Sequence, residues 1–256
     1  MKRFFFGFLL FTIGSQHSIA KATADTVVRG VAIHFNYDRN IFPESWLTEE
    51  INAHGVAVSR SEMDRCQINI STALQKYPQP VLVASLRAVY FLKSMDMYNV
   101  GFGGTNSKTA LYLTDDGESH GYTDSYLEQT FHHEFSSILF RNFPEKLDTA
   151  AWKAAIVPGF DYNDPYEGVG AIRKNESSQI LDSALSAKGF LTQYALSGIE
   201  NDINTIAQNL FRPEENFWGF VKYYPRIKKK VSLLISFYHK IDPAFTEAYF
   251  KGFTSQ

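Results

Sequence analysis

The first half of the chain places hydrophobic residues in short alternating runs, a pattern typical of strands. Residues 27–37 alternate from Val31 to Tyr37 and are expected to form one half-buried strand. Further strands are expected at residues 89–92, 98–102 and 109–114. Gly101, Gly103 and Gly104 predict a turn or bulge between the last two of these. The first half is therefore expected to carry a small mixed sheet.

Two helices are expected to interrupt these strands. Pro43 favours the first position of a short helix that ends before Gly55. Ser61 and Asp64 resemble a capping box and predict a second helix that continues to Tyr77.

The second half has mainly helical periodicity. A helix over residues 125–142 is expected, with Thr123 or Asp124 as its N-cap and Pro144 after its end. A loop is expected at 158–170, and further helices near 188–196, 199–211, 214–223, 226–241 and 243–251. Because the strands come first and the helices later, the sequence predicts an α+β fold. We expect one domain over residues 25–256, rich in sheet over 25–120 and helical over 121–256.

Residues 1–24 have the pattern of a signal peptide. Lys2 and Arg3 precede an apolar run, residues 4–13, and Ala22-Thr23-Ala24 fits an A-x-A cleavage site. The apolar run is about half the length that a membrane-spanning helix needs. The alternative is a buried N-terminal helix. The pattern predicts an exported protein, periplasmic or secreted.

The charge and cysteine content exclude several classes of function. The chain has 25 Lys+Arg and 27 Asp+Glu, a net charge of -2, which gives no basic surface for nucleic acid. The single cysteine, Cys66, excludes an intrachain disulfide framework and zinc sites built on several cysteines. No second apolar run is long enough to hold the protein in a membrane after signal cleavage.

The helix expected at 125–142 has one apolar and one polar stripe. At about 100° per residue, the apolar stripe is Leu127, Phe131, Phe135, Ile138 and Leu139, and the polar one Thr130, His133, Glu134, Ser137 and Arg141. His133-Glu134 is the first half of an H-E-x-x-H motif, in which two histidines hold zinc and the glutamate is the general base. Ser137 stands in the place of the second histidine. The alternative is a solvated helix face.

The order of motifs resembles a family of zinc-binding metallopeptidases found among exported bacterial proteins. The matching residues span roughly 85–211 and are Leu111-Tyr112-Leu113, His133-Glu134-Phe135, Ile138-Leu139, Gly189-Phe190, Tyr194-Ala195 and Glu200-Asn201-Asp202-Ile203. The resemblance implies a zincin-like fold, in which an edge-like strand at 110–113 holds an extended peptide by β-augmentation.

The resemblance also implies a site in which zinc is the cofactor. His133 and Glu200 would hold the metal and Glu134 would be the catalytic base. Asn201 occupies the register of the third ligand. Ser137 would lie beside the metal, and Asp202 would orient a ligand histidine through its ring N–H. A set rebuilt from His132, His133, Glu200 and Asp202 is an alternative.

Two functions therefore stay open at this stage. One is a metallopeptidase-like hydrolase with an incomplete or rebuilt zinc site, and the other is a non-enzymatic periplasmic or secreted binding protein on the same scaffold. The ligand in both is a peptide or protein. Serine catalysis by Ser137 and His133, one helical turn apart, is a further alternative, although no G-x-S-x-G turn surrounds Ser137.

Overall fold

The computed structural model describes residues 25–162 and 167–253. The expected signal peptide, residues 1–24, lies outside the described residues. Within the described part of the chain, no helix combines the length and the apolar character that crossing a membrane requires.

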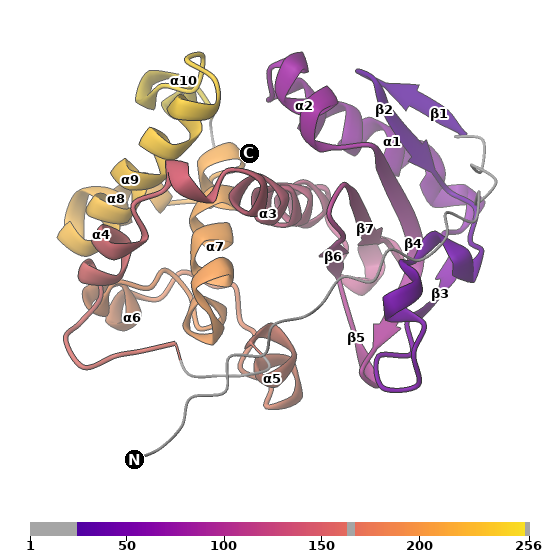
Figure 1. Ribbon diagram of the computed structural model, residues 1–256, viewed down its shortest axis with the longest axis horizontal. Coiled ribbons are helices and arrows are strands. Elements are labelled where there is room, and N and C mark those ends of the chain that lie inside the picture. The colour runs from indigo at the N-terminus through magenta and orange to yellow at the C-terminus, as the bar shows by residue number, and fades with distance from the viewer. Residues whose placement is uncertain (1–24, 163–166, 254–256) are drawn as a thin grey trace.

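The strands of the described residues form one mixed sheet in the N-terminal half, at the right of Figure 1. Its main path runs β1-β2-β4-β7-β6, and β3 and β5 pair with β4 outside this path. The strands are β1 Thr26–Val28, β2 Val31–His34, β3 His54–Ala57, β4 Ala88–Met97, β5 Val100–Gly101, β6 Gly104–Asn106 and β7 Ala110–Thr114. The central strand β4 is parallel to both β2 and β7. Together with the helical second half, this confirms the predicted α+β fold.

Two strand predictions differ from the structure. The strand expected at 27–37 is a hairpin of β1 and β2, because Arg29 and Gly30 adopt positive φ angles of 50° and 84° and reverse the chain. The strand expected at the edge, 110–113, lies inside the sheet between β4 and β6. The edge strand next to it is β6, which is formed by the glycine segment that we expected to be a turn.

Helices cover one side of the sheet and make up most of the second half (Figure 1). They are α1 Arg60–Gln75, α2 Gln79–Ser85, α3 Asp124–Asn142, α4 Thr149–Ala154, α5 Glu167–Arg173, α6 Ser183–Lys188, α7 Ile199–Phe211, α8 Phe217–Tyr223, α9 Pro225–Ile241 and α10 Glu247–Lys251. Short 3-10 turns occur at 39–41, 44–46, 118–120, 144–146 and 194–197. Thr123 caps α3 as expected, since its side chain accepts from the Tyr126 N–H. Helices α2, α4, α5 and α6 were not predicted, and α5 begins in the expected loop. The helices expected at 188–196 and after Pro43 are wrong, since these segments contain only 3-10 turns apart from Lys188, the last residue of α6.

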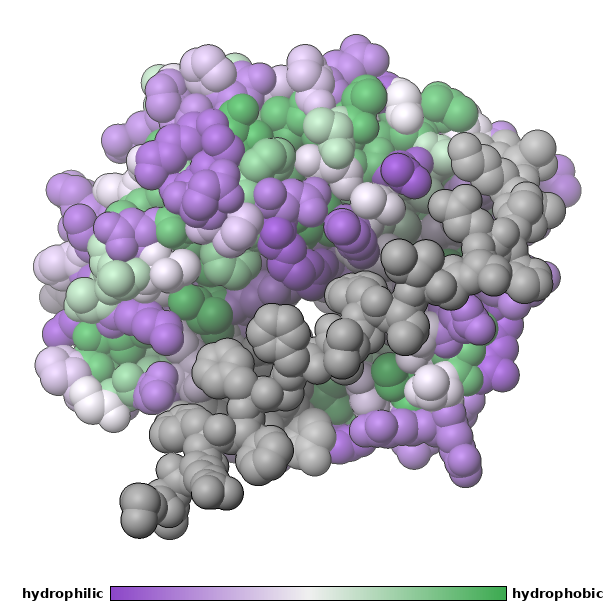
Figure 2. All heavy atoms as spheres, viewed as in Figure 1, coloured by the Kyte–Doolittle hydropathy of each residue, from purple (hydrophilic) through white to green (hydrophobic). Residues whose placement is uncertain are grey.

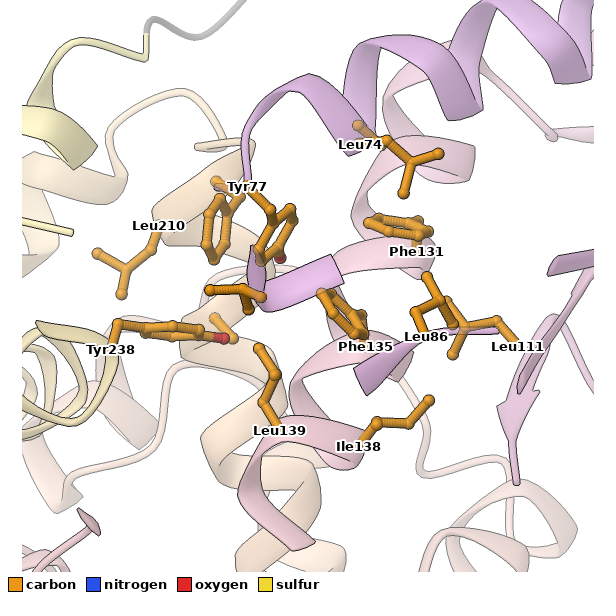
Figure 3. Close-up of a cluster of buried hydrophobic side chains, with 14 of the residues drawn as sticks. Leu74, Tyr77, Leu86, Leu111, Phe131, Phe135, Ile138, Leu139, Leu210 and Tyr238 are labelled. Atoms are coloured by element: carbon orange, nitrogen blue, oxygen red, sulfur yellow. The ribbon is translucent and has the colours of Figure 1, made fainter. Parts of the chain in front are cut away.

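Helix α3 lies at the centre of the molecule, between the sheet and the C-terminal helices (Figure 1). Its five predicted apolar positions are each at most 3% exposed, and Phe131, Phe135, Ile138 and Leu139 belong to the main core. Figure 3 shows Phe131, Phe135 and Ile138 of α3 in this core, and Tyr77 between them and α7. The Tyr77 ring centroid is 4.9 Å from that of Phe135 and 4.4 Å from that of Phe211. With its apolar stripe fixed in the core, α3 presents its polar stripe to the space between β6 and α7.

Candidate functional site

A cleft runs along the polar stripe of α3. It consists of two adjoining cavities of about 270 Å³ and 210 Å³. The residues that line both cavities are Phe102, Gly104, His133, Glu134 and Tyr194. Figure 2 shows hydrophilic residues along the upper border of the hollow near the centre of this face. His133 and Glu134 therefore face a shared cleft, which excludes a merely solvated helix face.

Edge strand β6 forms one wall and lies directly against α3. A Cβ atom at Gly104 would be 2.5 Å from Thr130 Cγ2 and 3.1 Å from Glu134 Cγ. A side chain at this position would push β6 away from the helix. Glycine is therefore required here because the strand and the helix approach so closely.

Strand β6 pairs with β7 on one side and, among the described residues, with no strand on the other. In the antiparallel pairing with β7, the Thr114 N–H donates to the Gly103 carbonyl over 2.9 Å, and Thr105 lies opposite Tyr112. Backbone groups alternate in direction along an antiparallel strand. The N–H and C=O of Gly104 and Asn106 therefore point away from β7, toward the cleft.

Glu134 lies on the floor of the cleft, half-buried, and contacts β6. Its Oε2 atom accepts from the Asn106 side-chain Nδ2 over 2.5 Å. Burial raises the pKa of Glu134 to about 7, against the hydrogen bond from Asn106, and the negative charge of Glu200 adds to this rise. The carboxyl group is thus poised to exchange a proton near neutral pH.

The ring nitrogen Nδ1 of His133 forms a hydrogen bond with helix α7. Its Nδ1 atom is 2.7 Å from the Gln208 side-chain oxygen Oε1. Because that oxygen can only accept, Nδ1 carries the proton and Nε2 is left as an acceptor. Burial lowers the pKa of His133, so the imidazole is neutral at pH 7.

The opposite wall is a polar stripe of α7 that sequence reasoning missed. Asn204 Nδ2 donates to Ser137 Oγ over 2.6 Å, and Gln208 binds His133 one turn further along. Asn201 starts the stripe and donates to Ser197 Oγ over 2.8 Å. The spacing 201, 204, 208 is one helix face, a signal that was present in the sequence. The residue opposite Ser137 is therefore Asn204, whereas Asn201, which we expected in the third-ligand register, hydrogen-bonds to His133.

Glu200 and Asp202, the other expected site residues on α7, face different surroundings. Glu200 lines the cleft and forms an ion pair with Arg141 at 3.1 Å. Asp202 is fully buried on the other side of α7, where Oδ2 is 2.8 Å from Trp152 Nε1 and 2.5 Å from Lys230 Nζ. The ring N–H of His133 is bound by Gln208, so the expectation that Asp202 orients this histidine is wrong. Adjacent residues on a helix diverge by about 100°, which sends Asp202 into the core.

His132 also lies in the core and cannot help to rebuild a metal site. It is fully buried, its Nδ1 is 2.9 Å from the Tyr77 hydroxyl, and its ring stacks on Phe211. The alternative ligand set with His132 and Asp202 is therefore excluded by their positions.

The residues of the cleft do not fit a three-ligand zinc site. Among the described residues, no group of three His, Cys, Asp or Glu side chains is placed to hold a metal ion. The side-chain amides of Gln208 and Asn201 hydrogen-bond to His133, and the Ser137 hydroxyl, one turn along α3, is bonded to Asn204. Neutral hydroxyl and amide groups are poor zinc ligands beside imidazole, thiolate or carboxylate.

Serine catalysis also has little support in this geometry. Ser137 is 1% exposed in the middle of α3, and its hydroxyl oxygen accepts from Asn204. The Nδ1 atom of His133 is bound by Gln208. Ser137 therefore lacks the exposed turn that serine nucleophiles use.

Comparisons with known proteins give a fold and little more. No protein-family model and no curated protein matches this chain. A solved structure described as a "putative zinc-binding metallo-peptidase" from Bacteroides caccae superposes with a TM-score of 0.53 and 15% identity, over 77% of this chain and 77% of that one. At this identity the likeness concerns the fold, and it agrees with the family resemblance noted in the sequence.

Proposed function

We propose that the protein binds extended peptide segments in the cleft along α3, by adding the peptide as a further strand to β6, and that it does so without a zinc ion. The observation that carries this proposal is the edge of β6 beside Glu134, which pairs with no other strand of the described residues. The Gly104 and Asn106 backbone groups point into the cleft, and no side chain at Gly104 separates the strand from the helix.

A peptide on this edge could form hydrogen bonds with both walls of the cleft, the backbone of β6 and the side chains of α7. Strand addition supplies main-chain hydrogen bonds that depend little on peptide sequence. The opposite wall offers the side-chain amides of Asn201, Asn204 and Gln208, which can both donate and accept. A peptide backbone, which alternates N–H and C=O groups, is a suitable partner for both walls.

The rival function is peptide hydrolysis at a zinc site, as the name of the structural neighbour suggests for that protein. His133, Glu134 and Glu200 are present in the cleft, but Glu200 is paired with Arg141. Ser137 is bonded to Asn204, and the partners of His133 are the amides of Gln208 and Asn201. These contacts favour binding over metal-dependent hydrolysis.

The proposal includes export to the periplasm or the exterior, on the pattern of residues 1–24. Expression with the natural N-terminus, cell fractionation and N-terminal sequencing of the product test it. We expect a product that begins at Asp25 outside the cytoplasm, and an intact cytoplasmic chain would contradict export.

Strand addition is tested by a proline in β6. Asn106→Pro removes the N–H that faces the cleft, whereas Asn106→Ala keeps it and removes only the side chain. The probe is a fluorescein-labelled pool of octapeptides built from Ala, Leu, Tyr, Ser and Gln, measured by fluorescence anisotropy. We expect about tenfold weaker binding for Asn106→Pro than for Asn106→Ala, since one backbone hydrogen bond is lost. Equal binding by both variants would contradict strand addition.

A further inference from the structure

We infer that the cleft continues past α3 into a third cavity and selects peptides that carry lysine or arginine side chains. This inference rests on the proposed peptide binding and adds the class of peptide. Three independent features of the lining carry it: continuity, charge and a set of buried oxygens without donors.

The third cavity extends the cleft toward the start of α3. It measures about 470 Å³ and shares Tyr126, Gln129 and Gln179 with the cavity that contains His133. From Arg141 at one end to Tyr126 near the other, α3 rises about 22 Å at 1.5 Å per residue. An extended peptide of about six or seven residues covers that length at 3.4 Å per residue.

Carboxylates outnumber cations along this path. The acids that line the three cavities are Glu134, Glu200, Glu214 and Glu215, and the one Lys or Arg among their described lining residues is Arg141. Arg141 already pairs with Glu200. Glu214 and Glu215 are both exposed at the third cavity. The groove is therefore complementary to a positively charged chain.

Buried oxygen atoms without donors line the same path. Asn106 Oδ1, Asn204 Oδ1 and Gln179 Oε1 are buried and have no hydrogen-bond partner among the described residues. Asn204 is 1% exposed as a whole residue. Buried polar atoms are seldom left without a partner, and an acceptor requires a donor. Ammonium and guanidinium groups supply several donors each and no acceptor.

The third cavity also has an apolar surface for the stem of such a side chain. Ile180 is 78% exposed and Tyr126 36% exposed, and both line it beside Glu214. Lysine and arginine place their methylene stems on apolar surface and keep the charged end near carboxylates or water. The pairing of exposed isoleucine with two glutamates fits this amphipathic shape.

The test compares three fluorescein-labelled octapeptide pools that share Ala, Leu, Tyr and Ser and differ in a fifth residue, Lys, Gln or Glu. The full mature protein is titrated with each pool at low salt, and binding is followed by anisotropy. We expect the lysine pool to bind about tenfold tighter than the glutamine pool, and the glutamate pool weakest. The advantage of the lysine pool should fall as salt is raised.

The variant pair Glu214→Gln with Glu215→Gln locates the selectivity. It should reduce the ratio of lysine-pool to glutamine-pool affinity from about tenfold to about threefold or less. Glu49→Gln with Glu50→Gln is the matched control, since it removes two adjacent exposed glutamates that line none of the three cavities.

The outcomes separate this inference from the proposed function. If the glutamine pool binds and the lysine pool binds no tighter, or if the two variant pairs behave alike, charge selection is wrong and peptide binding stands. If none of the pools binds, both the inference and the proposed function are wrong.

Discussion

Helix α3 carries two histidine–glutamate sets that lie in opposite environments. His132 and Glu128 face the core, where the Glu128 carboxylate is paired with Lys76 at 2.5 Å and Arg212 at 3.4 Å. His133 and Glu134 face the cleft, where the Glu134 carboxylate accepts a hydrogen bond from the neutral side-chain amide of Asn106.

The two carboxyl groups differ accordingly in pKa. Burial alone would raise the pKa of Glu128, but His132 and Lys76 lower it to about 2, whereas burial raises the pKa of Glu134 to about 7. A buried acid whose charge is fully compensated stabilises the fold. A carboxyl group in a cleft with a pKa near neutral pH is typical of binding and catalytic sites. The predictions below test this contrast, beginning with the largest effect.

Removal of the core carboxylate should have the largest effect on stability. Glu128→Gln leaves Lys76 and Arg212, whose side chains are 14% and 12% exposed, without their shared anion. We expect the free energy of unfolding to fall by about 3 kcal/mol, because breaking a buried ion pair leaves an uncompensated charge. Urea denaturation at pH 5 measures this. Glu134→Gln is the control at that pH, since Glu134 is then protonated, and an equal loss in both variants would refute the contrast.

Two substitutions that supply zinc ligands next to His133 should create a metal site in the cleft. Ser137→His with Asn204→Glu places an imidazole and a carboxylate on the two positions that face each other beside His133. We expect the double variant to bind about one equivalent of zinc and to gain about 2.7 kcal/mol of stability when free zinc is 100 times its Kd.

Metal analysis and urea denaturation with and without zinc check this prediction. Ser137→His alone is the control and should bind far less zinc. If the double variant folds but binds no zinc when zinc is supplied, position 204 is not a ligand position.

Stability should depend on pH through Glu134. The pKa of Glu134 in the folded protein, about 7, lies above its ordinary value of 4.5, so the folded state binds the proton more tightly. This contribution to stability is fully present below about pH 4.5 and is lost as the pH rises through 7. Allowing for solvent at the cleft wall, Glu134→Gln should be more stable than the natural protein by about 2 kcal/mol at pH 8.

Urea denaturation from pH 4.5 to 8 measures that difference. The contribution of Glu128 to stability changes with pH in the opposite direction. Its pKa is lowered, so its stabilising charge is lost only as the pH falls toward 2. A pH-independent difference between Glu134→Gln and the natural protein would be inconsistent with a raised pKa.

The smallest effect concerns the contact between β6 and α3. Gly104→Ala places a Cβ 2.5 Å from Thr130 Cγ2. We expect a loss of about 1 kcal/mol from overpacking and weaker peptide binding. Thr130→Ser removes that methyl group while keeping the hydroxyl bond to the Tyr126 carbonyl. It should therefore restore most of the loss in the double variant, and an absence of rescue would mean that the contact is not the cause.

The elements with strong local signals were predicted well from the sequence. The helix expected at 199–211 matches α7 at both ends, and the one expected at 125–142 differs from α3 by one residue. Their periodicity is contained within the segment, and at α3 a local N-cap adds to it. The polar stripe that faces the cleft followed from the same periodicity.

Features that depend on contacts between distant segments were not predicted. Strand β6 is only three residues long and begins at Gly104, so only its pairing with β7 and its contact with α3 define it. The roles of Asp202 and Asn204 depend on which face of α7 meets α3 and which meets Lys230. The sequence resemblance placed Asn201 in the third-ligand register, but it did not predict that Asn204 lies opposite Ser137, because that depends on how the two helices pack.

The central claim is that peptides bind to the edge of β6 without a metal ion. The most direct measurement is the affinity of the lysine octapeptide pool in excess EDTA and again with one equivalent of zinc, with mass spectrometry of the peptides afterwards. The account predicts equal affinity within about twofold and intact peptides in both conditions. Binding that vanishes in EDTA, or cleavage that appears only with zinc, would contradict it.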